Sequence, residues 1–224
     1  MQYFVSLPDG WTADKKWPVV IVIEGADRQF AETAQEFSQA QKGSPFIIVT
    51  PLVVTNGGAG VRNVPTYHYA PSVWDEIESK GPWVFDRDGI AAVVRDVVHS
   101  YGGEETVFMT GFEAGGHTVW AQTFQRPETL RAVVLVCPNY LGRYMDETKF
   151  SQSPSRAQLP IRGFYGGDDE LAKVGHPIRG QWDTAEKAAK EHGFQNVGYE
   201  SVPGKGHVHL AAEVLGYFMD LLKR

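Results

Sequence analysis

The chain has 224 residues, of which 42% are hydrophobic and 21% are charged, and its formal net charge is −6. This length fits one domain with a sizeable core, and we predict a single domain over residues 1–224. An acidic chain without a basic stripe argues against binding to nucleic acid or to an anionic membrane surface. Because no apolar run approaches the roughly 18 residues of a membrane span, we expect a soluble protein, cytoplasmic as written, or secreted if an upstream signal was removed.

Short apolar runs alternate along the chain with amphipathic helical stretches. The first run, Tyr3–Leu7, is expected at the edge of a sheet. Six further runs, most of them rich in Val and Ile, are predicted as strands buried on both faces: Val19–Glu24, Phe46–Thr50, Thr106–Thr110, Ala132–Cys137, Ile161–Tyr165 and Val197–Val202. The predicted helices are Phe30–Gln41, Asp86–His99, Gly116–Gln125, Trp182–His192 and Val208–Leu222. This alternation predicts an α/β fold, a mostly parallel and doubly wound sheet with helices on both faces.

The longest stretch without a predicted element runs from Pro51 to about Pro71. It contains the glycine-rich segment Asn56–Gly60 and two tyrosines, Tyr67 and Tyr69. A loop of this length in a compact domain is usually functional or disordered. Its aromatic residues either pack the loop onto the body or line a pocket, and we place both tyrosines in a candidate pocket wall.

A turn bounded by glycines follows the Thr106–Thr110 run. Its sequence, Gly111-Phe112-Glu113-Ala114-Gly115, joins a predicted strand to a predicted helix. Glycine at both ends permits a strained turn that exposes the middle side chain. The pattern resembles the G-x-S-x-G nucleophile elbow of the α/β-hydrolase superfamily, with glutamate in the position of the serine.

The resemblance implies that a catalytic acid and then a histidine follow the elbow along the chain. Asp169, which comes after the Ile161–Tyr165 run, is the expected acid, and its neighbour Asp168 is the alternative. His207 lies in a glycine-containing loop before the last predicted helix. We therefore expect His207 as the histidine of the site and prefer it to His209.

The resemblance also implies an oxyanion hole, built from the amide after the nucleophile and an amide after the first long strand. In this chain those amides belong to Ala114 and Ala26. The family usually has histidine before the glycine of that loop, whereas this chain has Glu24, which we place in the candidate pocket. From about Val19 to Leu222 the order resembles compact esterases of the polyhydroxybutyrate-depolymerase and feruloyl-esterase type, without a large lid domain.

A glutamate at the elbow changes the chemistry. A serine esterase needs a hydroxyl that histidine can deprotonate, and Glu113 has none. We therefore expect an esterase-like pseudoenzyme that keeps a pocket for a small-molecule acyl or aromatic ester-type ligand and uses no cofactor. Glu113 is expected to be an anion at a helix N-terminus, where it either occupies the oxyanion hole or pairs with His207.

Several alternatives stay open, so the sequence does not settle whether the chain is an enzyme. The protein could be a non-catalytic ligand-binding or regulatory module, or Glu113 could be an engineered replacement of serine. Glu113 could also attack an alkyl carbon, as elbow aspartates do in related folds. Carboxylates from Glu24, Glu113 and Asp169 could meet His207 around a hard divalent ion, although we assign no metal ligands.

Overall fold

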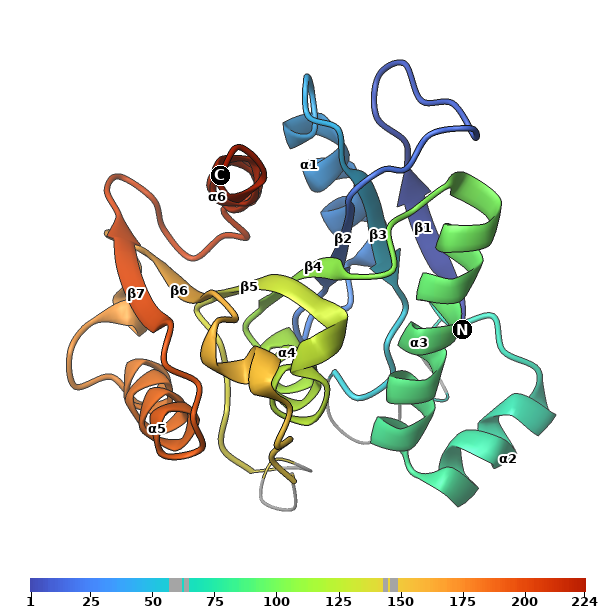
Figure 1. Ribbon diagram of the computed structural model, residues 1–224. Coiled ribbons are helices and arrows are strands. Elements are labelled where there is room, and N and C mark those ends of the chain that lie inside the picture. Colours follow the sequence, from blue (N-terminus) through green and yellow to red (C-terminus); the bar gives the residue numbers. More distant parts are fainter. Residues whose placement is uncertain (57–61, 63–64, 143–144, 146–148) are drawn as a thin grey trace.

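The computed structural model describes residues 1–56, 62, 65–142, 145 and 149–224 (Figure 1). Within these residues seven strands form one sheet in the order β1-β3-β2-β4-β5-β6-β7. β1 runs antiparallel to β3, and every other neighbouring pair is parallel. The strands are β1 (Tyr3–Ser6), β2 (Val19–Ile23), β3 (Ile47–Pro51), β4 (Val107–Phe112), β5 (Leu130–Val136), β6 (Ile161–Gly166) and β7 (Val197–Val202).

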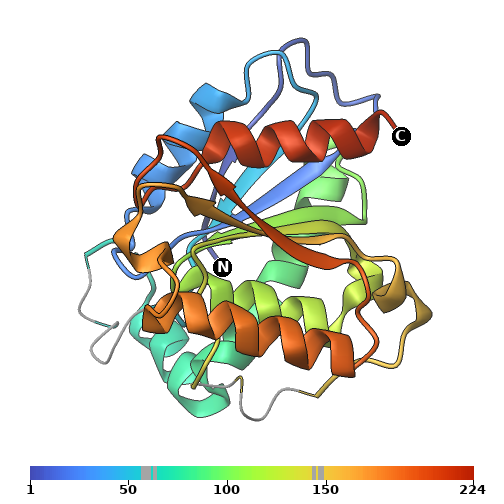
Figure 2. The same ribbon diagram turned by 90° about the vertical axis from the view of Figure 1, so that its left-hand side faces the viewer.

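Helices cover both faces of this sheet. They are α1 (Phe30–Ala40), α2 (Pro71–Lys80), α3 (Pro82–Tyr101), α4 (Gly115–Gln125), α5 (Pro177–Glu191) and α6 (Ala211–Leu222). Figure 2 shows α1 and α6 on one side of the sheet and α4 and α5 on the other. The predicted α/β architecture, with a mostly parallel sheet and helices on both faces, is therefore confirmed.

The side chains of β2 show how the sheet divides the core. Val19, Ile21 and Ile23 point to the cluster that includes apolar residues of α3, α4 and α5. Val20 and Val22 point to a second cluster with residues of α1 and α6. Because strand side chains alternate between faces, a continuous apolar run is what a strand buried on both sides requires.

Within the described residues, one α-helix was not predicted from the sequence, α2. It begins at Pro71 and buries Trp74 and Ile77, and α3 begins at Pro82, before the predicted Asp86. Proline suits the first turn of a helix because that turn leaves its backbone N–H groups without helical partners. The expected long stretch therefore ends where α2 begins, as predicted, and its glycine-rich segment after Asn56 lies outside the described residues.

The last helix begins three residues later than predicted, at Ala211 instead of Val208. Leu210 has φ 53°, in the left-handed region that a right-handed helix excludes. Residues up to Leu210 consequently form a loop at the end of β7. In the described part of the chain, no helix is both long and apolar enough to cross a membrane.

Candidate active site

The turn between β4 and α4 has the tight geometry of a strand–helix elbow. Glu113 at its apex has φ 47°. A Cβ on Gly111 would lie 2.6 Å from Cγ2 of Val119, and a Cβ on Gly115 would lie 2.6 Å from the carbonyl oxygen of Ile23. The two glycines therefore allow the helix to pack closely on the sheet, and the turn holds the glutamate at the carboxyl end of β4.

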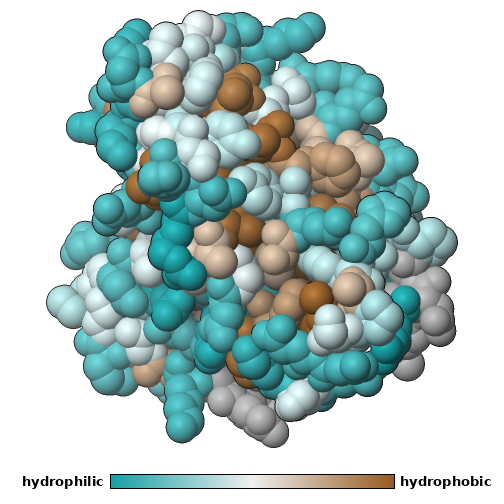
Figure 3. Space-filling model, turned by 90° about the vertical axis from the view of Figure 1, so that its right-hand side faces the viewer, coloured by the Kyte–Doolittle hydropathy of each residue, from teal (hydrophilic) through white to brown (hydrophobic). Residues whose placement is uncertain are grey.

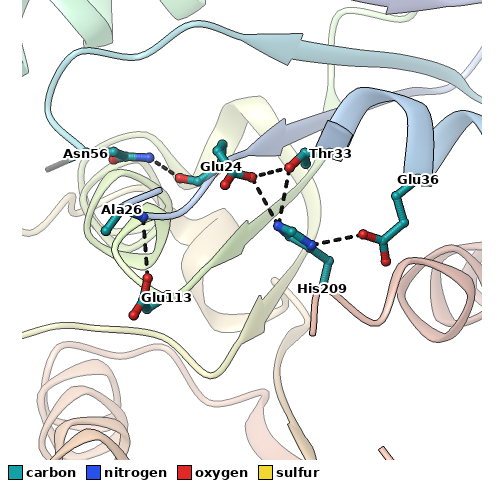
Figure 4. Close-up of polar contacts among 7 residues, drawn as sticks. All are labelled: Glu24, Ala26, Thr33, Glu36, Asn56, Glu113 and His209. Atoms are coloured by element: carbon teal, nitrogen blue, oxygen red, sulfur yellow. Dashed lines mark hydrogen bonds and ion pairs between the residues drawn. The ribbon is translucent and has the colours of Figure 1, made fainter. Parts of the chain in front are cut away.

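The Glu113 carboxylate lies beside one of the two amides expected in an oxyanion hole. Its Oε2 accepts a long hydrogen bond from the Ala26 N–H at 3.4 Å (Figure 4). The backbone of Glu113 is otherwise engaged, since its N–H donates to Val136 O at 3.0 Å and its carbonyl accepts from Gly116 N at 2.9 Å. The Ala114 N–H has no acceptor among the described residues. One expected donor thus faces the carboxylate and the other is unused.

Asp169 and His207 form a hydrogen-bonded pair. Asp169 Oδ2 lies 2.8 Å from His207 Nδ1, while Asp169 Oδ1 accepts from Leu171 N at 2.8 Å. Burial would raise the pKa of Asp169, but hydrogen bonds from His207, Leu171 and Cys137 together lower it. The Asp169 side chain is only 2% exposed and that of His207 is 30% exposed, whereas the alternative acid Asp168 is exposed. The buried Asp169 carboxylate therefore holds the His207 imidazole, which is partly exposed to solvent.

The structure does not join the glutamate to this pair. Among the described residues, no hydrogen bond or ion pair connects Glu113 with His207. Of the two positions predicted for the Glu113 carboxylate, the structure shows a contact with the Ala26 amide, which was expected in an oxyanion hole. The other position, in which the carboxylate pairs with the histidine, is not formed.

Cys137 is a buried core residue that lies beside the Asp169–His207 pair. It follows β5 with φ 45° and is 1% exposed. Its thiol lies within 4.8 Å of ligand atoms of Asp169 and His207. Burial, followed by the carboxylates of Asp169 and Glu113, raises the pKa of the thiol. Cys137 is consequently a protonated hydrogen-bond donor beneath the Asp169–His207 pair. In the sequence, its position at the end of a predicted strand was the available signal that it lies near the pair.

The carboxylates suggested for a metal site do not gather in one place. Within the described residues, the group close enough to share an ion is Cys137, Asp169 and His207, and it excludes Glu24 and Glu113. A protonated, buried thiol is a poor ligand because metals bind the thiolate. The geometry therefore does not indicate a hard-cation site.

Glu24 was expected in the pocket, but its side chain points elsewhere. It is 2% exposed and accepts a hydrogen bond from the Thr33 hydroxyl. Its Oε2 also lies 3.1 Å from His209 Nε2. Figure 4 shows these partners on one side of the loop and Glu113 on the other. Hydrogen bonding within the interior thus draws Glu24 away from the elbow.

The two tyrosines pack their loop onto the body of the protein. Tyr67 is 6% exposed and donates a hydrogen bond to Val53 O at 2.7 Å. Tyr69 stacks on Tyr67 with ring centroids 6.0 Å apart and accepts from Gln2 N at 3.1 Å. Tyr69 borders a hollow of about 450 Å³ that does not include Glu113. The structure therefore does not place either tyrosine against the elbow.

The hollow beside Tyr69 lies between the N-terminus, α2 and α3. Figure 3 views the side of the molecule that carries these helices, where apolar side chains gather between hydrophilic ones. The residues that line this hollow include Met1, Val73 and Phe85, together with the charged residues Glu76 and Lys80. This surface is separate from the residues around the elbow.

No family model matches the chain, and no curated protein matches it in sequence. Solved structures do resemble it over almost its whole length. A protein of Klebsiella pneumoniae assigned as a dienelactone hydrolase is 17% identical, with a TM-score of 0.66 over 99% of this chain and 92% of that one. The poly(3-hydroxybutyrate) depolymerase of Bordetella parapertussis is 17% identical, with a TM-score of 0.62 over 99% and 87%.

An S-formylglutathione hydrolase of Agrobacterium tumefaciens is 12% identical, with a TM-score of 0.65 over 99% of this chain and 89% of that one. These identities are low, so the similarity establishes the shared fold. Together with the sheet order and the strand–helix elbow, it shows that the chain has the fold of the α/β-hydrolase superfamily.

Proposed function

We propose that the protein is an esterase-like α/β-hydrolase that does not work by the serine route and binds a neutral acyl or aromatic ester-type ligand beside Glu113. The observation that carries the proposal is the contact between the Glu113 carboxylate and the Ala26 amide. This side chain occupies the elbow apex, where a nucleophile would stand, and one of its oxygens lies where a substrate oxyanion would bind.

The Asp169–His207 pair supports a hydrolase ancestry for the site. Its 2.8 Å hydrogen bond fixes the imidazole in the way that an acid fixes the base of a hydrolytic triad. A carboxylate has no proton for that base to remove. Attack by the carboxylate on an ester would form an anhydride, which returns readily to the starting ester. The serine-type reaction is consequently blocked at the elbow, while the base is retained.

The charge of the site selects the class of ligand. An ionised Glu113 repels a ligand that carries its own carboxylate next to the carbonyl. An uncharged ester instead offers apolar groups and a carbonyl oxygen, which can accept from the unused Ala114 N–H. A short aryl or alkyl ester is therefore the proposed ligand class.

Restoring the hydroxyl tests this proposal. We expect Glu113→Ser to hydrolyse p-nitrophenyl acetate and butyrate on the order of 100-fold faster than Glu113→Ala, because a positioned base assists a hydroxyl but not a methyl group. The unchanged protein should match Glu113→Ala in turnover and still bind the esters, as measured by calorimetry. Unhydrolysed amide analogues of the esters should inhibit Glu113→Ser, which measures binding to the same site in the variant. A folded Glu113→Ser variant without gained turnover or ester binding would contradict the proposal.

A carboxylate nucleophile is a second candidate, favoured by a specific contact. Oε2 of Glu113 is held by an amide, whereas Oε1 has no hydrogen bond among the described residues. Oε1 could form a C–O bond to the alkyl carbon of a halide as the halide ion leaves. His207 would then take a proton from water, whose oxygen attacks the carboxyl carbon and releases the alcohol.

Isotope labelling separates this candidate from the first. In a single turnover of an alkyl halide in ¹⁸O-labelled water, the label should enter the Glu113 carboxylate and not the first alcohol released. Mass spectrometry of the peptide that contains Glu113 reads the label directly. Glu113→Gln is the matched control, because it preserves the shape but has no carboxylate, and it should neither turn over nor incorporate label. Absence of turnover in the unchanged protein eliminates this route.

A further inference from the structure

A second histidine lies close to the candidate active site and is bound at both ring nitrogens by carboxylates. His209 Nε2 lies 3.1 Å from Glu24 Oε2, and His209 Nδ1 lies 3.0 Å from Glu36 Oε2. A carboxylate accepts hydrogen bonds, so both nitrogens must carry protons to donate. Figure 4 shows the ring between the two carboxylates, an arrangement that fits an imidazolium held by two anions.

The three residues come from segments that are far apart in the sequence. Glu24 directly precedes Gly25 and Ala26, and Glu36 lies in α1. His209 lies two residues after His207 in the loop between β7 and α6. The imidazolium thus links the loop with an oxyanion-hole amide to the loop with the candidate base, and it anchors both on a helix.

Phe112 places this ion group against the candidate active site. Its ring centroid lies 4.4 Å from that of His209 and 4.8 Å from that of His207. Phe112 is also the residue immediately before Glu113 at the elbow. A shift of His209 would therefore act on the packing of the elbow and of His207 together.

We propose that protonated His209 is a positioning residue that ties the Glu24–Ala26 loop to the His207 loop, so that the spacing of the two halves of the site depends on one imidazolium. Loss of its proton would remove one of the two donors, so that the ring would lose its hydrogen bond either to Glu24 or to Glu36. The remaining hydrogen bond would tie the His207 loop either to the Glu24–Ala26 loop or to α1, but not to both. This inference does not depend on the proposed ester ligand.

The charges that face His209 all favour its protonated form. Glu24 lies at the end of β2 and Glu36 on α1, while the Thr33 hydroxyl on α1 is 3.3 Å from Nε2. The cation nearest along the loop, Lys205, is paired with Glu213 of α6 at 3.1 Å. Burial lowers the pKa of His209, but the hydrogen bonds and charges of the two carboxylates raise it to about 9.

Hydrogen exchange in His209→Gln tests the proposal. Glutamine cannot bridge two carboxylates with two donated hydrogen bonds from the ring positions, and it carries no charge. At pH 7.5 we expect peptides covering residues 24–26 and 203–209 to exchange roughly tenfold faster than in the unchanged protein. The ratio of the two rates should approach one above about pH 9, because the unchanged protein then loses the same imidazolium. A packing role alone would leave the ratio independent of pH.

His99→Gln is the matched control, because His99 is an exposed histidine on α3, and it should leave both peptides unchanged. If His209→Gln does not fold, NMR of the unchanged protein gives an independent test. The His209 ring signals and the Ala26 amide should then shift with one common midpoint near pH 9. A rate ratio near one at pH 7.5, a ratio that does not vary with pH, or unlinked titrations would overturn the proposal.

Discussion

At the scale of single residues, the elbow leaves no room for a side chain at Gly115. A Cβ there would lie 2.6 Å from the carbonyl oxygens of both Ile23 and Glu24, which are backbone atoms that cannot move alone. We expect Gly115→Ala to lower the free energy of unfolding by about 2 kcal/mol or more, as measured by urea denaturation. Gly216→Ala is the control, since Gly216 lies in α6 with open space around it and alanine favours helix. Equal losses in both variants would show that close approach at the elbow is not the cause.

The residues of the candidate site differ in how far sequence could locate them. Asp169 and His207 were identified because the fold family places them at particular strand ends, and the structure brings the two into contact. The interaction of Glu24 with His209 spans 185 residues and depends on which way two side chains point. Periodicity and turn patterns carry no information on that direction, so Glu24 was assigned to the wrong surroundings.

At the scale of elements, one buried carboxylate fastens the segment after β3 to α3. Asp86 of α3 accepts hydrogen bonds from Val54 N at 2.9 Å and from Thr55 N and Oγ1 at 2.8 and 2.6 Å. Burial raises the pKa of Asp86 to about 7 even though these donors oppose the shift. The contact therefore replaces strand pairing where the chain leaves the sheet.

Removal of this carboxylate should loosen the segment after β3. We expect Asp86→Ala to lower the free energy of unfolding by about 3 kcal/mol, because it leaves buried N–H groups without acceptors. Asp86→Asn keeps one acceptor oxygen and should lose less. Thermal unfolding followed by circular dichroism compares the two variants, and an alanine variant as stable as the asparagine variant would contradict the assignment.

Elements with a continuous apolar run were predictable, whereas helix starts were not. All six predicted strands are present, because apolar runs rich in Val and Ile leave few other structures. The expectation of burial on both faces is wrong for β7, which lies at the edge of the sheet with Tyr199, Glu200 and Ser201 exposed. Helix α2 was not predicted from the sequence, although Pro71 is a helix-start signal. The start of α6 follows Leu210, whose left-handed conformation is not signalled by the sequence.

At the scale of the whole molecule, His209 makes stability depend on pH in the alkaline range. Its pKa is raised from 6.5 to about 9, so the folded state holds the proton more tightly than the unfolded state. This contribution is fully present below about pH 6.5 and is lost as the pH rises through about 9. The loss is at most about 3.5 kcal/mol, from roughly 1.4 kcal/mol per pKa unit over the shift from 6.5 to about 9.

Urea denaturation between pH 6 and pH 10 measures this loss. The free energy of unfolding should fall across that range in the unchanged protein and stay flatter in His209→Gln. Well below pH 6 the free energy of unfolding should instead fall as the pH decreases. The pKa values of Glu24 and Asp169 are lowered in the folded state, so their stabilisation is lost as the pH falls through those values. Parallel profiles of the two proteins on the alkaline side would refute the contribution of His209.

The positive φ of Glu113 has a consequence for how this scaffold can be reused. The neighbouring glycines and the packing of α4 on β2 and β4 impose the bend, and an unbranched residue such as Glu113 adopts it at a cost of about 1–2 kcal/mol. The apex position therefore accepts different side chains: serine, cysteine or aspartate can replace glutamate there without a change in the surrounding backbone. β-Branched residues fit its backbone conformation poorly. A protein that has changed its chemistry at such a position remains one substitution away from a different one.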